Sequence, residues 1–159
     1  MARYLLYHGT TKEAYKDILE NGISLKKTRD TADFGAGFYL TPNKGVAKAR
    51  VANKLNPAVM QFELNGDDLN VKKFKLDDEW KEEVFRQRIL GIDDLTDYDY
   101  IVGPIADGIM RRMIKAYNIG EITKEEFLNN ISHGELPKKV QIVIKSYNAV
   151  NQCKFCKEG

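Results

Sequence analysis

The chain has 159 residues, of which 43% are hydrophobic and 30% are charged, and its formal net charge is +2. This length fits one domain with a real core, so we expect a single domain over residues 1–159. A near-neutral charge gives no support from charge alone for nucleic-acid or membrane binding. No segment reaches the ~18 apolar residues of a membrane span. Residues 1–7 are too short for a signal peptide, so we expect a cytoplasmic protein without membrane contact.

The first third of the chain predicts strands and helices in alternation. Residues 3–7 are aromatic and aliphatic and indicate a buried strand. Thr10 and Glu13 form a capping box that opens a helix, and Gly22 ends it. The next predicted elements are a short strand over 37–41, a helix over 44–55 and a strand over 58–64.

Asn65-Gly66 is a turn signal, so we expect the strand over 58–64 to form a hairpin with a strand over 69–74. Asp77 or Asp78 caps a helix, and Trp80 leads its apolar face, which assigns Trp80 to the core. The remaining predicted elements are a strand over 99–102 ended by Gly103-Pro104, an amphipathic helix over 105–117, a helix opened by the capping box Thr123–Glu126, and a last strand over 140–144. Strands scattered among helices without strict βαβ alternation predict an α+β domain.

Cys153 and Cys156 are the cysteines of the chain. One Cys-x-x-Cys without a second pair or nearby histidines is at most half a zinc site. We therefore expect residues 151–159 to form a flexible, reduced tail and the protein to hold no metal. A zinc ion shared across a dimer is the alternative.

Two glycine-bearing motifs carry the chemistry. The first, Tyr7 to Thr10, follows the first apolar run, and the second is Asp33 to Thr41, read Asp-Phe-Gly-Ala-Gly-Phe-Tyr-Leu-Thr. Glycines let a backbone approach another molecule closely. A histidine at a strand end is often structural, but His8 offers a donor or acceptor beside exposed peptide groups. Together with an aromatic face, this set suits a flat heteroaromatic ligand that carries a ribose.

The two motifs resemble those of the ADP-ribosyltransferase superfamily, in the branch of diphtheria toxin and the poly(ADP-ribose) polymerases. That branch has His-Gly-Ser/Thr after a first strand and Gly-x-Gly followed by an aromatic or aliphatic residue and Tyr on a second. The chain is more closely similar to the bacterial DUF3990 family, which adds a tryptophan-led helix and a Gly-Pro-Ile-Ala-Asp segment, here Glu79-Trp80 and Gly103 to Asp107. The resemblance runs from about residue 4 to about residue 150.

The resemblance implies a single-domain ADP-ribosyltransferase-like α+β fold in which two small half-sheets and flanking helices form an NAD+ cleft. It implies that His8 hydrogen-bonds the ribose beside nicotinamide, that Gly9 pairs its backbone with the carboxamide, and that Tyr39 stacks on the ring. The other motif residues expected to bind NAD+ are Thr10, Asp33, Phe34, Gly37 and Phe38. The basic stretch Lys26, Lys27 and Arg29 is either a solvated loop or, through Arg29, a clamp for the diphosphate.

Two departures from the superfamily pattern concern the reacting sugar and the ring. The late strand over 140–144 carries Gln141 where the superfamily has a glutamate. Glutamine binds ribose hydroxyls but supplies no negative charge to an oxocarbenium-like transition state. Asp107 is then the candidate for this role, although a helix N-terminus explains an aspartate equally well, and Asp99 is a weaker candidate. No second aromatic follows Tyr39 at the usual spacing, so the second face of the ring would be covered by Phe38, by a distant aromatic or by nothing.

The segment after Tyr39 that lacks this second aromatic carries Arg50, which could reach a phosphate. The resemblance therefore predicts a mono-ADP-ribosyltransferase that uses NAD+ as co-substrate, releases nicotinamide and modifies a protein, a nucleic acid or a small metabolite. A small bacterial enzyme of this type suggests an intracellular toxin or effector with an antitoxin partner. The alternatives are a non-catalytic module that binds NAD+ or ADP-ribose, an NAD+ glycohydrolase, and an RNA 2′-phosphotransferase, which the near-neutral charge disfavours.

Overall fold

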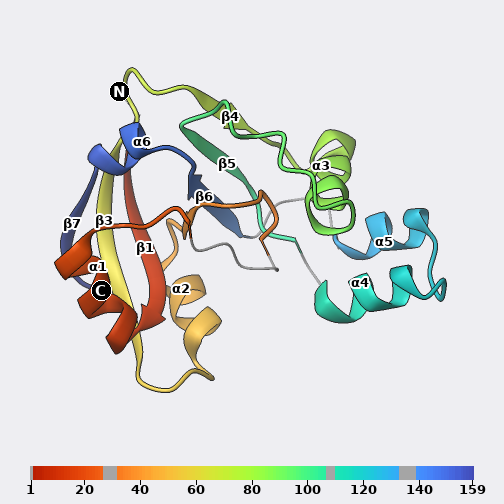
Figure 1. The fold of residues 1–159 in the computed structure, drawn as a ribbon, viewed down its shortest axis with the longest axis horizontal. Coiled ribbons are helices and arrows are strands. Elements are labelled where there is room, and N and C mark those ends of the chain that lie inside the picture. The colour runs from red at the N-terminus through yellow and green to blue at the C-terminus, as the bar shows by residue number, and fades with distance from the viewer. Residues whose placement is uncertain (1, 27–31, 107–109, 133–138) are drawn as a thin grey trace.

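The computed structural model describes residues 2–26, 32–106, 110–132 and 139–159. In chain order its elements are β1 (Arg3–Thr11), α1 (Lys12–Asn21), β2 (Phe38–Leu40), α2 (Lys44–Val51), β3 (Pro57–Asn65), β4 (Val71–Lys73), α3 (Asp78–Arg88), β5 (Tyr100–Pro104), α4 (Met110–Asn118), α5 (Lys124–Asn130), β6 (Val140–Ile144), α6 (Tyr147–Asn151) and β7 (Cys153–Glu158). This mixture of strands and helices is the α+β class that the sequence predicts (Figure 1).

The described strands form two small sheets. One has the order β1-β3-β7 and is antiparallel, and the other has the order β2-β6-β5-β4. In the second sheet β4 pairs with β5 in parallel, while β6 is antiparallel to both of its neighbours. Figure 1 shows the first sheet on the left with α1, and α3, α4 and α5 beyond the second sheet on the right.

The second sheet is the middle layer between two hydrophobic cores. Ile142 and Ile144 of β6 pack in one core with Leu6 of the first sheet. Val143, which lies between them in the strand, packs on the opposite face with Trp80 of α3. Alternate side chains of a strand point to opposite faces, so one short strand serves both cores. The full burial of Trp80 confirms its assignment to the core.

The helix boundaries follow local hydrogen bonds. Thr11, and not Thr10, caps α1, because β1 continues through Thr11 and its hydroxyl accepts from the amide of Ala14 at 3.2 Å. Gly22 ends this helix as predicted, with φ of +82° and its amide donating to the Ile18 carbonyl at 2.8 Å. The capping box of Thr123 and Glu126 is confirmed. None of the helices in the described ranges is long and apolar enough to cross a membrane.

The predicted hairpin across Asn65-Gly66 is wrong. Both edges of β3 are already occupied, by β1 and β7, so no further strand can pair with it. The amide of Gly66 donates to the carbonyl of Ala2 at 2.6 Å, and Asp99 accepts from the amide of Asn70 at 2.8 Å. The chain therefore crosses to the second sheet, where β4 pairs with β5.

The expectation of a flexible tail over residues 151–159 is also wrong. Residues Cys153–Glu158 form β7, which pairs with β3 along the edge that β1 leaves open. Phe155 packs edge-on against Phe62 with ring centroids 5.8 Å apart, and Cys153 is buried, so the strand has apolar contacts that hold it. Burial raises the pKa of the Cys153 thiol to about 12, which leaves it unreactive, whereas Cys156 is exposed.

Candidate functional site

The two sheets meet where β1 passes the end of β2. The amide of Tyr7 donates to the carbonyl of Thr41 at 2.8 Å, and the amide of Thr41 donates to the carbonyl of Tyr7 at 2.9 Å. This isolated bridge joins the first motif to the end of the second. Side chains just beyond it in both motifs therefore lie close together although about 30 residues separate them in sequence.

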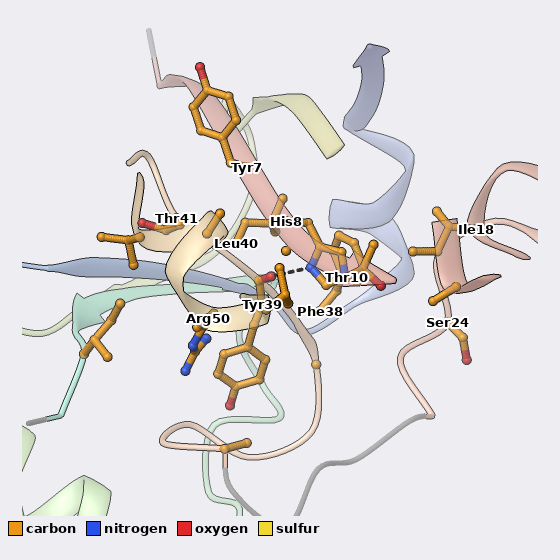
Figure 2. A pocket seen from close by; sticks show the side chains of 18 of the residues that line it. Tyr7, His8, Thr10, Ile18, Ser24, Phe38, Tyr39, Leu40, Thr41 and Arg50 are labelled. Atoms are coloured by element: carbon orange, nitrogen blue, oxygen red, sulfur yellow. Dashed lines mark hydrogen bonds between the residues drawn. The ribbon is translucent and has the colours of Figure 1, made fainter. Parts of the chain in front are cut away.

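His8 spans this junction. Its Nδ1 lies 2.7 Å from the backbone carbonyl oxygen of Tyr39 (Figure 2). A carbonyl oxygen only accepts, so Nδ1 carries the proton, and in the neutral ring Nε2 is then the acceptor. The imidazole also stacks on the ring of Phe38 at 4.1 Å with 29° between the planes. The hydrogen bond and the stacking fix both the tautomer and the orientation of the ring.

Gly9 is required by helix packing. A Cβ on Gly9 would lie 2.4 Å from the carbonyl oxygen of Ala47, so only glycine lets α2 pack this closely on β1. Strand peptide groups alternate in direction, so the N–H and C=O of Gly9 point to the same side as those of Tyr7. On this side the peptide groups of Tyr7 bind Thr41 at the end of β2. The peptide groups of Gly9, two residues further along β1, face the cavity described next.

A cavity of about 260 Å³ opens beside the junction. Six of the predicted ligand-binding residues line it, namely His8, Gly9, Thr10, Gly37, Phe38 and Tyr39 (Figure 2). Helix α1 contributes Asp17 and Ile18 to the wall, and helix α2 contributes Val46 and Arg50. Drug-sized ligands occupy pockets of roughly 300–1,000 Å³, so this smaller cavity has room for one aromatic ring but not for a whole dinucleotide.

Tyr39 offers the cavity its ring and not its hydroxyl. The hydroxyl donates to the carbonyl of Gly35 at 2.6 Å and accepts from the amide of Phe34 at 3.0 Å. Burial raises the pKa of Tyr39, so the phenol stays neutral. Phe38, the preceding residue, faces the opposite side of β2, packing on His8 and Phe62. Phe38 and Tyr39 therefore point to opposite sides of β2, which disfavours Phe38 among the predicted partners for the second face of the ring.

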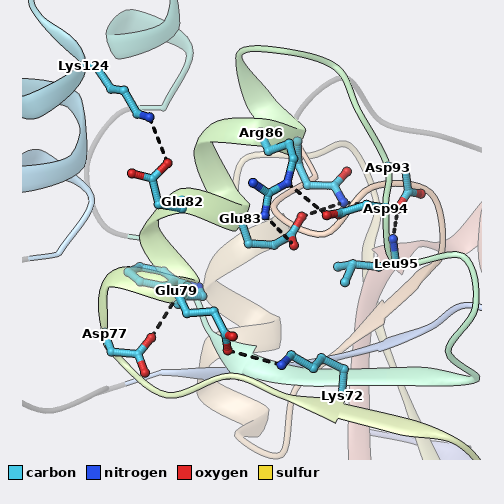
Figure 3. Close-up of polar contacts among 12 residues, drawn as sticks. Lys72, Asp77, Glu79, Glu82, Glu83, Arg86, Asp93, Asp94, Leu95 and Lys124 are labelled. Atoms are coloured by element: carbon cyan, nitrogen blue, oxygen red, sulfur yellow. Dashed lines mark hydrogen bonds and ion pairs between the residues drawn. The ribbon is translucent and has the colours of Figure 1, made fainter.

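The loop that carries the second motif rests on a polar network under it. Lys145 is almost fully buried and donates to the carbonyl of Phe34 at 2.8 Å and to Asp93 Oδ2 at 2.7 Å. Asp93 also accepts from the amide of Leu95 at 3.1 Å (Figure 3). A Cβ on Gly35 would lie 2.4 Å from Asp93 Oδ2, and its φ is +78°, so both packing and backbone require glycine here.

Asp33 and Phe34 were predicted to bind the ligand, and the structure places both outside the cavity. Asp33 is 2% exposed, and its Oδ1 accepts from Arg88 at 2.6 and 2.9 Å. Its Oδ2 accepts from the amide of Ala106 at 3.2 Å. Phe34 is fully buried and stacks on Phe74 with ring centroids 5.3 Å apart. The ion pair and the core explain these two motif residues without a ligand.

Gln141 is predicted to touch the reacting sugar, but the structure places its side chain away from the cavity. Its side chain is 1% exposed and does not line the cavity. Nε2 donates to Asp33 Oδ2 at 2.9 Å and to the Pro104 carbonyl at 3.0 Å, so both amide protons are used inside the protein. Its role in the described structure is to hold β6, the end of β5 and the motif loop together.

Two other predicted residues, Arg29 and Asp107, lie outside the described residues, as does Lys27. Lys26 is exposed. Asp99 accepts from the amide of Asn70 and from the hydroxyl of Ser146 at 2.6 Å, which is a structural role for this weaker candidate.

Sequence reasoning missed Asp17 and Ile105 in the cavity wall. Asp17 lies three residues after Ala14 and one before Ile18 on α1, so helical spacing from the predicted apolar face was the signal that could have found it. Asp17 Oδ1 accepts from Asn21 Nδ2 at 2.8 Å. Arg50 also lines the cavity, so Asp17 and Arg50 bring one negative and one positive charge to its wall.

Within the described part of the chain no group of histidine, cysteine, aspartate or glutamate side chains could hold a metal ion. No curated protein matches the sequence. One family model matches residues 4–155, nearly the whole length, and its family is described as a protein of unknown function. The chain therefore belongs to the DUF3990 family.

Proposed function

We propose that the protein is a mono-ADP-ribosyltransferase with an ADP-ribosyltransferase-like fold that uses NAD+ as its co-substrate. The observation that carries the proposal is the junction of β1 and β2, where His8, the peptide edge of Gly9 and the ring of Tyr39 meet at one cavity. A carboxamide offers one acceptor and one kind of donor, which a strand edge satisfies without side chains. An aromatic ring stacked on another contributes ~1–3 kcal/mol.

In the proposed reaction the bond between nicotinamide and ribose C1 breaks, and nicotinamide leaves with the bonding electron pair. The acceptor nucleophile forms a bond to the same carbon and loses its proton to solvent. The oxocarbenium-like transition state has positive charge on the ribose, so positioning and a nearby carboxylate accelerate the step. His8 Nε2 would hold a ribose hydroxyl, and Tyr39 would hold the departing ring.

Gln141 does not reach the cavity, so the proposal needs a carboxylate from another residue. We assign this role to Asp107 on the basis of the Gly-Pro-Ile-Ala-Asp motif. Asp107 follows Ala106, whose amide donates to Asp33 Oδ2. Asp17 is the carboxylate that lines the cavity within the described residues, and it is the competing assignment. For a small bacterial enzyme of this type, the setting that we propose is an intracellular toxin or effector neutralised by an antitoxin.

The second candidate is a module that binds NAD+ or ADP-ribose without turnover. The burial of a neutral glutamine at the third-motif position favours it, since no charge is supplied there. An Asp107→Asn variant separates the two. For an enzyme, nicotinamide release falls ~100-fold while calorimetry still detects NAD+ binding. If the unmodified protein binds NAD+ and releases no nicotinamide, the binding module is correct.

A further inference from the structure

Two helices, α2 in the cavity wall and α4, carry cations and no carboxylate. From Pro42 to Phe62, which includes α2, the chain contains no aspartate or glutamate, and α4 contains none either. The cations of these two segments, all exposed, are Lys44, Lys48, Arg50, Lys54, Arg111, Arg112 and Lys115. Because the net charge of the whole chain is only +2, the rest of it is net acidic, and the overall composition conceals this concentration.

The cations of α2 and α4 differ from those of α1, α3 and α5 in having no acidic neighbours on their own helices. Around α3, Lys72 pairs with Glu79 at 3.2 Å and Lys124 pairs with Glu82 at 2.9 Å (Figure 3). Among the ion pairs of the described residues, none involves Lys44, Lys48, Arg111, Arg112 or Lys115.

Each helix also repeats a cation at i and i+4, as Lys44 with Lys48 and Arg111 with Lys115. Like charges at this spacing repel and weaken a helix unless an anion lies against them.

Helix α2 adjoins the candidate site, and α4 follows one of the wall residues along the chain. α2 forms part of the cavity wall through Val46 and Arg50, and Ile105, also in the wall, precedes the start of α4 by five residues. In the view of Figure 1 both helices lie in the lower half of the molecule. A ligand that enters the cavity therefore lies against the cationic helix α2, and the second cationic helix, α4, begins five residues after the wall residue Ile105.

We propose that α2 and α4 bind a nucleic-acid strand, which is the acceptor of ADP-ribose; this rests on the transferase function proposed above. The cations exceed what the two phosphates of NAD+ need, whereas a strand presents a phosphate at every nucleotide. Met113 and Ile114 of α4 pack against the core, so its apolar face is not available to enter a lipid surface. An oxygen or nitrogen of the strand would attack ribose C1, nicotinamide would leave with the bonding pair, and the nucleophile's proton would pass to solvent.

Direct binding tests the surface without depending on catalysis. Fluorescence anisotropy would follow a labelled single-stranded oligonucleotide with the unmodified protein, with Lys44→Glu/Lys48→Glu and with Arg111→Glu/Arg112→Glu. Lys154→Glu/Lys157→Glu is the matched control, with the same charge change on exposed residues of β7. We expect each test variant to bind at least 10-fold more weakly, and the control to bind as the unmodified protein does. With four to seven phosphate contacts, the logarithm of affinity falls by about 3–5 per tenfold rise in salt.

The transfer assay, with labelled NAD+ and the same oligonucleotide, separates this inference from the proposed function. If the unmodified protein labels the oligonucleotide, and the two test variants lose this labelling but still release nicotinamide into water, the result supports both the inference and the transferase function. Nicotinamide release without binding or labelling of any oligonucleotide overturns the inference and leaves the transferase standing. Oligonucleotide binding without nicotinamide release supports the surface and overturns the enzyme. Equal binding by all variants, or binding only to anionic vesicles or to an acidic protein, overturns the inference.

Discussion

The imidazole of His8 and the backbone carbonyl of Tyr39 join two sheets through one hydrogen bond of 2.7 Å between Nδ1 and the carbonyl oxygen. This bond sets the tautomer of His8, so a change at this position alters the site and not only the packing. We expect His8→Ala to lower nicotinamide release ~100-fold with little change in Tm. His133→Ala, which removes the other histidine of the chain, is the control and should keep full activity. Equal activity of the two variants would refute the assignment.

The hydroxyl and the ring of Tyr39 have separable roles. Tyr39→Phe keeps the ring but leaves the carbonyl of Gly35 and the amide of Phe34 without this partner. We expect it to lose ~1–3 kcal/mol of stability while nicotinamide release stays within about 10-fold. Tyr39→Ala removes the stacking surface and should lower the rate ~100-fold. Denaturant unfolding and rate measurements on both variants test this, and a Tyr39→Phe variant as inactive as Tyr39→Ala would give the hydroxyl the catalytic role.

Substitution of Gly9 should lower stability through a purely steric effect. Gly9→Ala forces a Cβ against the carbonyl oxygen of Ala47, where backbone must move, and overpacking of this kind destabilises by ~1–3 kcal/mol. Gly45→Ala is the control, since its Cβ would meet only the side chain of Asn43 at 3.2 Å and alanine favours a helix. At about 2–4 °C per kcal/mol, the first variant should unfold several degrees lower and the second should not. A Gly9→Ala protein of unchanged Tm would contradict the close approach of α2.

The ion pair of Asp33 and Arg88 should be far more important for stability than a surface pair. Both side chains are nearly buried, at 2% and 6% exposed, so Asp33→Asn leaves an uncompensated buried guanidinium and costs about 3–5 kcal/mol. Glu63→Gln breaks the exposed pair with Arg3 and should cost about 0–1 kcal/mol. Urea unfolding of both proteins measures the difference. Similar losses in the two variants would mean that Asp33 is not a structural anchor.

Glu83 should make stability depend on pH. Burial and the neighbouring carboxyl of Asp94 raise the pKa of Glu83 from 4.5 to about 7 (Figure 3). Between these values the folded protein keeps a proton that the unfolded chain has lost, so stability falls as pH rises through this window, by roughly 1–3 kcal/mol. Glu83→Gln stays neutral, and its Tm should exceed that of the unmodified protein at pH 8 by more than at pH 5. A difference that does not vary with pH would contradict the raised pKa.

The sequence predicted the α+β class, most helices and six residues of the cavity wall, because hydrophobic periodicity, capping residues and glycine motifs are local signals. It could not predict strand pairing. The turn at Asn65-Gly66 was read as a hairpin, but both edges of β3 are filled by β1 and by β7 from the other end of the chain.

The same limit explains why two predicted site residues lie outside the cavity. Asp33 accepts from Arg88 and Ala106, and Gln141 donates to Asp33 and to the Pro104 carbonyl, all of them partners distant in sequence. Asp17 was missed because helical spacing places it beside the apolar face of α1, while its place in the wall depends on how α1 packs.

The most direct test of the central claim is incubation of the purified protein with labelled NAD+ in a cell lysate. It would follow nicotinamide release and the fate of the ADP-ribose label, with His8→Ala in parallel. The proposal predicts nicotinamide release and label on an acceptor for the unmodified protein, and loss of both in His8→Ala. Release with only free ADP-ribose would indicate a glycohydrolase. No release from the unmodified protein, or equal release from His8→Ala, would contradict the proposed enzyme.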